Sequence, residues 1–89
     1  MKQVRLVIFG HVQGVFFRES TKRKALELGV KGLVRNNEDG SVECVAQASE
    51  DVLRLFIEWC HKGPESARVG SVRVEEMSVQ KLSGFEIVR

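Results

Sequence analysis

An α+β sandwich, with two helices on one face of a mainly antiparallel sheet, is the fold class that the sequence predicts. Segments with strand and helix periodicity follow one another in the order β-α-β-β-α-β, and a short strand comes last. No linker, low-complexity segment or repeat interrupts them, so we expect residues 1–89 to form a single domain. This order is that of a ferredoxin-like sandwich.

The first predicted strand runs from Val4 to Val12 and carries apolar residues on both faces. Such a pattern indicates a central strand that is at least partly covered on both sides. A helix is predicted over Glu19–Leu28, because apolar residues recur there at helical spacing while charged residues can face water. Gly29 then supplies a helix stop.

A hairpin is predicted over Gly32–Ala48. Its strands are Lys31–Asn36 and Val42–Ala48, and the residues between them, Asn37–Gly40, have turn chemistry. Asp39 is expected to form the turn rather than to act as an acid.

The second helix is predicted to start after Ser49, a good N-cap, and to end at Gly63–Pro64. A fourth strand is predicted over residues 71–79. Its apolar phase shifts between Val74 and Met77, so a bulge or a strand end is expected there. A short fifth strand is predicted for residues 85–89.

Composition and net charge limit the classes of function that the chain can have. Apolar residues make up 43% and charged residues 29%, and the net charge of +2 lacks the basic excess of a nucleic-acid binder but suits a small anionic substrate. The basic run Lys22–Lys24 is read as a solvated helix face. No apolar run reaches membrane length and no signal peptide is seen, so a cytoplasmic monomer without membrane or nucleic-acid partners is expected.

The two cysteines, Cys44 and Cys60, form no CxxC pair, so no zinc or iron–sulfur ligand set is evident. We expect two buried thiols, although the sequence also permits a disulfide between them. Trp59 is expected to belong to the core.

The loop Gly10–Arg18 lies between a predicted strand and a predicted helix. Its glycines allow backbone N–H groups to face an anion, the helix adds the positive end of its dipole, and Arg18 adds a guanidinium that matches phosphate. The GK[ST] ending of a Walker A loop is absent. An ordinary turn with a surface arginine remains the alternative reading of these local features.

Topology predicts that Asn36 meets this loop. A right-handed crossover makes the first two strands run the same way, so both end at the same edge of the sheet. One antiparallel strand separates them, which places their backbones roughly 10 Å apart. Arg18 and Asn36 can then converge on one small group.

Four segments resemble motifs of the acylphosphatase family, and the similarity covers essentially the whole chain. The segments are Gly10-x-Val12-Gln13-Gly14-Val15-x-Phe17-Arg18; Gly32-x-Val34-x-Asn36 with Asp39-Gly40-Ser41-Val42; Gly63-Pro64-x-Ser66-Ala67-x-Val69; and Gly84-Phe85-x-Ile87. Three positions depart from the family pattern: Leu33 replaces an aromatic residue, Ala48 replaces glycine, and Phe16 occupies a position that is often small. Because Phe16 could crowd the loop or shape the mouth of the pocket, this departure concerns which substrates are preferred.

The resemblance implies hydrolysis of a small acyl phosphate to a carboxylate and inorganic phosphate, with no metal or cofactor. It implies that Arg18 holds the phosphate and that Asn36 positions the attacking water. The backbone N–H groups that it assigns to the phosphate are those of Gln13, Gly14, Val15, Phe16 and Phe17. A phosphate oxygen of the substrate can accept the proton of the water. His11 is the alternative base, although a surface residue at a strand end is the preferred reading.

A binding module is the rival class, because ferredoxin-like domains also include RNA-binding folds and metal chaperones. The third predicted strand, Val42–Ala46, lacks the aromatic residues of an RNA-binding motif, and the paired-cysteine loop of a chaperone is missing. A non-catalytic sensor of small phosphorylated ligands could use the same loop as an enzyme.

Overall fold

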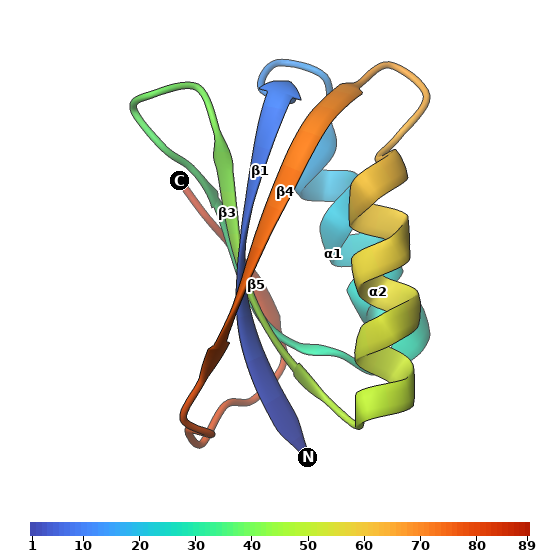
Figure 1. Ribbon diagram of the computed structural model, residues 1–89, viewed down its shortest axis with the longest axis vertical. Coiled ribbons are helices and arrows are strands. Elements are labelled where there is room, and N and C mark those ends of the chain that lie inside the picture. The colour runs from blue at the N-terminus through green and yellow to red at the C-terminus, as the bar shows by residue number, and fades with distance from the viewer.

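The computed structural model describes residues 1–89 and confirms the predicted sandwich. Its elements are β1 (Lys2–His11), α1 (Phe17–Leu28), β2 (Lys31–Asn36), β3 (Val42–Ala48), α2 (Glu50–Lys62), β4 (Arg68–Met77) and β5 (Phe85–Val88). The five strands form one sheet in the order β4-β1-β3-β2-β5. Both helices pack on the same face of this sheet (Figure 1). Neither helix has the length and apolar character needed to cross a membrane.

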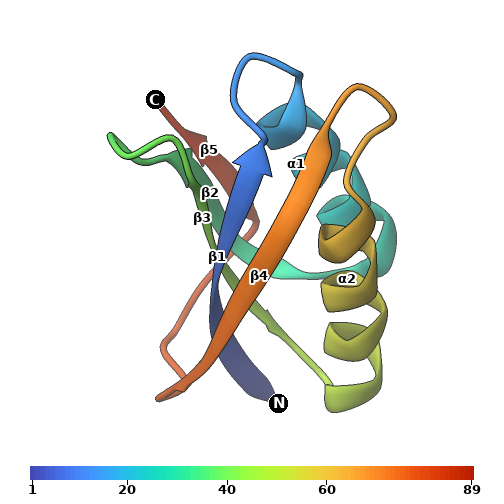
Figure 2. The same ribbon diagram turned by 45° about the horizontal axis from the view of Figure 1, so that its top comes forward.

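Strand directions bring three strand ends to one edge of the sheet. β3 lies between β1 and β2 and is antiparallel to both, so β1 and β2 run the same way, as predicted. β5 pairs with β2 in parallel. The loop after β1, the β2–β3 turn and the chain end after β5 therefore lie at the same end of the molecule (Figure 2).

The core fills the space between the helices and the sheet. Leu6, Ile8 and Phe56 are fully buried in it, and Phe17 packs on Trp59 with ring centroids 5.8 Å apart. Trp59 is partly buried against this core, which confirms its structural role. These contacts fix α1 and α2 on the sheet and thereby fix the loops that precede and follow them.

Cys44 and Cys60 are buried free thiols, as the preferred reading predicts. Burial raises the pKa of Cys60 to about 12 and raises the pKa of Cys44 well above its usual value. Both thiols therefore stay protonated at neutral pH and behave as small apolar groups.

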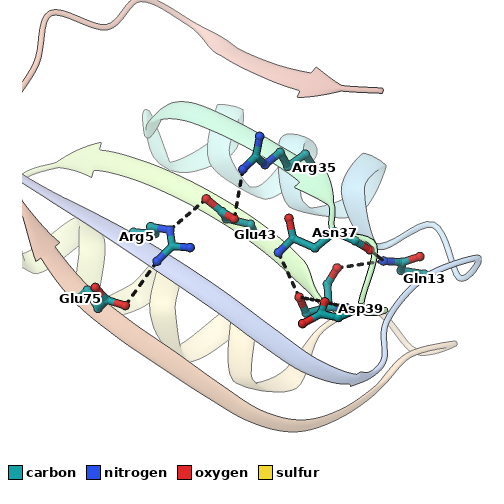
Figure 3. Close-up of polar contacts among 8 residues, drawn as sticks. Arg5, Gln13, Arg35, Asn37, Asp39, Glu43 and Glu75 are labelled. Atoms are coloured by element: carbon teal, nitrogen blue, oxygen red, sulfur yellow. Dashed lines mark hydrogen bonds and ion pairs between the residues drawn. The ribbon is translucent and has the colours of Figure 1, made fainter.

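The other face of the sheet carries charged side chains in place of a helix. Arg5 on β1 bridges Glu75 on β4 and Glu43 on β3, at 3.3 and 2.9 Å, and Glu43 also pairs with Arg35 on β2 at 3.4 Å. Figure 3 shows this row across four strands. The hydrogen bond from Arg5, aided by the charge of Arg35, lowers the pKa of Glu43. Val7 is nonetheless buried on this face, so β1 is covered in part on both sides.

Several element boundaries differ from prediction. β1 starts at Lys2, two residues before the predicted Val4, because pairing with β3 begins there, and it ends at His11, the last residue paired with β4 and one before the predicted Val12. α1 starts at Phe17, two residues before the predicted Glu19. β4 starts at Arg68 and ends at Met77, which confirms a strand end at that point.

The irregularity in β4 lies away from the predicted place. The register with β1 shifts between Phe9 and Gly10, which pair with Ser71 and Val69 and so leave Gly70 as the extra residue. Residues 74–77 remain in regular pairing with β1. Apolar and polar residues do not alternate regularly there because β4 is an edge strand whose side chains are mostly exposed.

Candidate functional site

A pocket of about 210 Å³ opens where the β1–α1 loop meets the end of β2. Its walls are Val12, Gly14, Phe16, Phe17, Arg18, Glu19 and Asn36. Arg18 and Asn36, which are eighteen positions apart in the sequence, thus line one pocket. Of the five other residues of the predicted phosphate loop, Gly14, Phe16 and Phe17 line the pocket, whereas Gln13 and Val15 do not.

The start of α1 supplies free backbone donors to this pocket. The first N–H groups of a helix have no partner within the helix. Phe16 is the N-cap residue and makes no side-chain capping hydrogen bond, and the Glu19 carboxylate accepts a hydrogen bond from its own backbone N–H. Gly14, Phe16 and Phe17 all line the pocket beside them. An uncapped helix start with an adjacent guanidinium is a suitable environment for a small anion.

Gln13 and Val15 are not among the residues that line the pocket, and the Gln13 side chain and the Val15 carbonyl group hold the loop in place. The Gln13 side-chain amide donates hydrogen bonds to the carbonyl oxygens of Asn37 and Ser41, at 2.7 and 2.9 Å (Figure 3). The Ser66 hydroxyl, in the α2–β4 connection, donates to the carbonyl oxygen of Val15 at 2.8 Å. The loop is therefore held on one side by the β2–β3 turn and on the other by the α2–β4 connection. These hydrogen bonds of Gln13 and Ser66 were not predicted from the sequence. The one indication in the sequence was a polar residue, Gln13, within a glycine-rich loop.

The β2–β3 turn is held by its own polar side chains. Asp39 accepts hydrogen bonds from the backbone N–H and the hydroxyl of Ser41, at 3.0 and 2.6 Å, and Asn37 donates to the same hydroxyl at 3.0 Å. The hydrogen bonds from Ser41 lower the pKa of Asp39. Asp39 is thus a turn former, as predicted, and the turn fixes the end of β2 at Asn36.

The chain end after β5 also reaches the site. Arg18 donates a hydrogen bond through Nη1 to the carbonyl oxygen of Val88 at 3.4 Å. Arg89 pairs with Glu19 at 3.4 Å. Neither of these two contacts was predicted from the sequence, although the parallel pairing of β5 with β2 brings the ends of both strands to the same edge of the sheet.

Glu19 lines the pocket, although sequence reasoning expected it to face water on the helix. A hydrogen bond from its own backbone N–H is the main cause that lowers the pKa of Glu19; burial opposes this shift, and Arg89 and Arg18 lower the pKa further. Its carboxylate therefore stays ionised and is a poor proton acceptor at neutral pH. Its position directly after Arg18 was the only signal in the sequence.

His11 is exposed at the end of β1 and is not part of the pocket wall. No group of three or more His, Cys, Asp or Glu side chains is placed to hold a metal ion. A larger groove of about 370 Å³ lies between α2 and β4, where Leu53, Ile57 and Val74 are mixed with charges of both signs. That groove has no glycine-rich loop, and the helix start beside it is capped by Ser49 and carries the acidic Glu50, so we place the candidate site in the smaller pocket.

The fold and the pocket together define a small α+β protein whose candidate site combines the start of a helix with one guanidinium and one amide side chain. The model of the acylphosphatase family matches residues 4–87. An acylphosphatase of Rubrobacter xylanophilus is 47% identical over 87 residues, which cover 97% of this chain and 79% of that protein. An acylphosphatase of Methylococcus capsulatus is 43% identical over 90 residues, covering 100% of this chain and 98% of that protein.

Solved structures agree with the sequence comparison. The crystal structure of acylphosphatase from Bacillus subtilis superposes with a TM-score of 0.97 at 34% identity and covers the whole of both chains. The chain therefore belongs to the acylphosphatase family. It is an acylphosphatase that hydrolyses acyl phosphates to a carboxylate and inorganic phosphate.

Proposed function

We propose that Arg18 and the backbone N–H groups of residues 13–17 bind the phosphate of the substrate, and that the Asn36 amide positions the attacking water. The observation that carries this assignment is the shared pocket, in which Arg18 and Asn36 lie with the uncapped start of α1. A guanidinium offers paired donors that match two phosphate oxygens. An amide offers both a donor and an acceptor, and so can orient a water molecule.

The proposed reaction needs little beyond positioning and charge stabilisation. The water oxygen forms a bond to phosphorus, the bond from phosphorus to the acyl oxygen breaks, and the carboxylate leaves with that electron pair. The proton of the water passes to a phosphate oxygen. Arg18 and the main-chain donors offset the negative charge of the phosphoryl group, which is the task that Mg²⁺ performs in other enzymes of phosphoryl transfer.

Glu19 does not act as the base in this scheme. Its pKa is lowered, so it holds its negative charge at neutral pH and would repel a phosphate if left alone. The ion pair with Arg89 offsets that charge. Arg89 thereby keeps the pocket suitable for an anion.

Hydrolysis of benzoyl phosphate in the presence of EDTA tests the proposal. We expect the wild-type chain to release inorganic phosphate at an undiminished rate in EDTA, and Arg18→Ala to lose about 10³-fold or more in kcat/KM. Arg23→Ala is the matched control, because Arg23 is an exposed arginine on the same helix outside this pocket. Full activity in a folded Arg18→Ala variant would refute the role of Arg18, and binding of phosphate without turnover would favour a sensor.

We also propose that residues 1–89 act as one domain, as a cytoplasmic monomer with a small-molecule substrate. The helix-free face of the sheet supports the monomer, because it carries the ion-paired row of Arg5, Glu43 and Arg35 rather than an apolar patch. The free thiols of Cys44 and Cys60 are consistent with a reducing compartment. Sedimentation equilibrium tests the oligomeric state, and a dimer at micromolar concentration would contradict it.

A further inference from the structure

The side chain of Phe16 is unusually placed for an aromatic residue. It is 75% exposed, the highest value among the large hydrophobic residues, and it forms part of the pocket wall with Arg18 and Asn36. Other exposed apolar residues, such as Leu26 on α1 and Leu55 on α2, do not line this pocket. Exposure at the rim of the site is therefore specific to Phe16.

The backbone at Phe16 is strained. Its φ of 61° and ψ of 27° lie in the left-handed region, and Phe16 is the only residue other than glycine with positive φ. This conformation is unfavourable for a bulky residue and is usually occupied by glycine. A strained conformation that the surrounding structure maintains is a reason to ask what function it serves.

Packing within the domain does not explain the ring. Phe16 lies outside the hydrophobic core cluster and takes part in neither of the two aromatic pairs. The neighbouring Phe17, in contrast, is 2% exposed and packs on Trp59. The chain therefore uses one of two adjacent phenylalanines for the core and holds the other against the mouth of the pocket.

We propose that the Phe16 ring contacts the acyl group of the substrate and makes this enzyme prefer acyl phosphates with an aromatic or extended apolar acyl group. This inference rests on the proposed function, because a phosphate held by Arg18 must direct its acyl substituent out of the pocket toward the rim. Most of the ring surface is free to pack against an apolar group there. Aromatic packing of this kind contributes roughly three- to tenfold in binding.

Steady-state kinetics with benzoyl phosphate and acetyl phosphate test the inference. The measured quantity is the ratio of the two kcat/KM values, and comparing this ratio between variants removes the intrinsic reactivity of each substrate. We expect Phe16→Ala to lower the benzoyl-to-acetyl ratio about three- to tenfold, chiefly through a higher KM for benzoyl phosphate. The inhibition constant of inorganic phosphate, which has no acyl group, measures any accompanying damage to the loop.

Three further variants separate the ring from the backbone. Phe16→Gly also lacks the ring but relieves the left-handed strain, so it should show the same lowered ratio with a higher melting temperature than Phe16→Ala. Phe16→Tyr keeps the ring and should keep the wild-type ratio. Leu26→Ala is the control for loss of an exposed apolar side chain on α1, and it should leave both substrates unaffected.

The outcomes distinguish this inference from the function on which it rests. If Phe16→Ala lowers both kcat/KM values equally, or if Phe16→Gly keeps the wild-type ratio, the ring does not select the acyl group although the enzyme assignment stands. If the folded wild-type chain hydrolyses neither substrate, the proposed function is overturned and the inference with it.

Discussion

Replacement of Gln13 by methionine tests how the phosphate loop is held. Methionine has nearly the length of glutamine but cannot donate the hydrogen bonds to the carbonyl oxygens of Asn37 and Ser41, at 2.7 and 2.9 Å. Each lost hydrogen bond costs about 1 kcal/mol in net stability, so Gln13→Met should lower the free energy of unfolding by about 2 kcal/mol. For a domain of this size that corresponds to a fall of roughly 10 °C in melting temperature.

The larger effect should be on catalysis. The Gln13 side chain joins the loop that carries Arg18 to the turn that follows Asn36, so its loss releases the two halves of the site from each other. A displacement of about 1 Å between reacting groups can cost roughly 10²-fold in rate. We therefore expect Gln13→Met to lower kcat on acetyl phosphate by about 10- to 100-fold, measured at a temperature where urea denaturation shows the variant to be folded.

A second glutamine provides the matched control. The side chain of Gln80 accepts a hydrogen bond from Gln3 at 3.1 Å, in the loop between β4 and β5 at the opposite end of β1. Gln80→Met should destabilise the domain by about 1 kcal/mol and leave kcat within twofold of wild type. Equal kcat values for the Gln13 and Gln80 variants would refute the coupling between loop and turn.

Three other perturbations have defined outcomes. Asn36→Ala should lower kcat far more than the affinity for inorganic phosphate, measured by product inhibition, and equal losses would contradict its role toward water. Gly32→Ala should destabilise the domain by at least about 3 kcal/mol in urea denaturation, because a Cβ at its φ of +151° would overlap a carbonyl of β3, whereas Gly29→Ala has open space and should cost only about 1 kcal/mol. Since burial raises the pKa of Cys60 to about 12 and also that of Cys44, the unfolded chain loses thiol protons first as pH rises. The contribution of the two buried thiols to the free energy of unfolding should thus be fully present below about pH 8.5 and should fall above it by about 1 kcal/mol per pH unit for each thiol. Urea denaturation between about pH 8 and 10.5 measures this slope, and Cys60→Ala should reduce it.

The sequence predicted the fold well where periodicity and turn chemistry act locally. The Ser49 cap and the Gly63 stop of α2 are found as expected, since each depends on only a few neighbouring residues. Prediction failed where pairing partners decide the outcome. The bulge at Gly70 follows from the close approach of Gly10 and β4, which no local pattern in residues 71–79 reveals.

The candidate site was predictable in part for the same reason. The order of strands alone predicted that Arg18 and Asn36 meet, because the direction of each strand follows from the right-handed crossover. The part played by Glu19 and by the chain end at Arg89 was not predictable, since it depends on which side of α1 faces β5. Likewise, only backbone geometry shows that Phe16 rather than a glycine takes the left-handed position.

The contacts give a physical reason for the four motif segments, which are far apart in the sequence. Gln13 joins the first segment to the turn of the second, through Asn37 and Ser41. Ser66 of the third segment holds the carbonyl of Val15 in the loop.

Glycines complete the connection between the segments. A Cβ on Gly63 would lie 2.8 Å from the ring of Phe17, so glycine allows the end of α2 to approach the start of α1. Gly84 of the fourth segment accepts a hydrogen bond from the backbone N–H of Gly32 at 2.9 Å, which sets β5 beside β2 and brings Val88 to Arg18. Each segment thus fixes one side of the same loop, and a loop fixed on several sides can bind phosphate with donors already in place. That rigidity is what a site made of main-chain N–H groups requires, because such donors cannot reorient toward the transition state as side chains can.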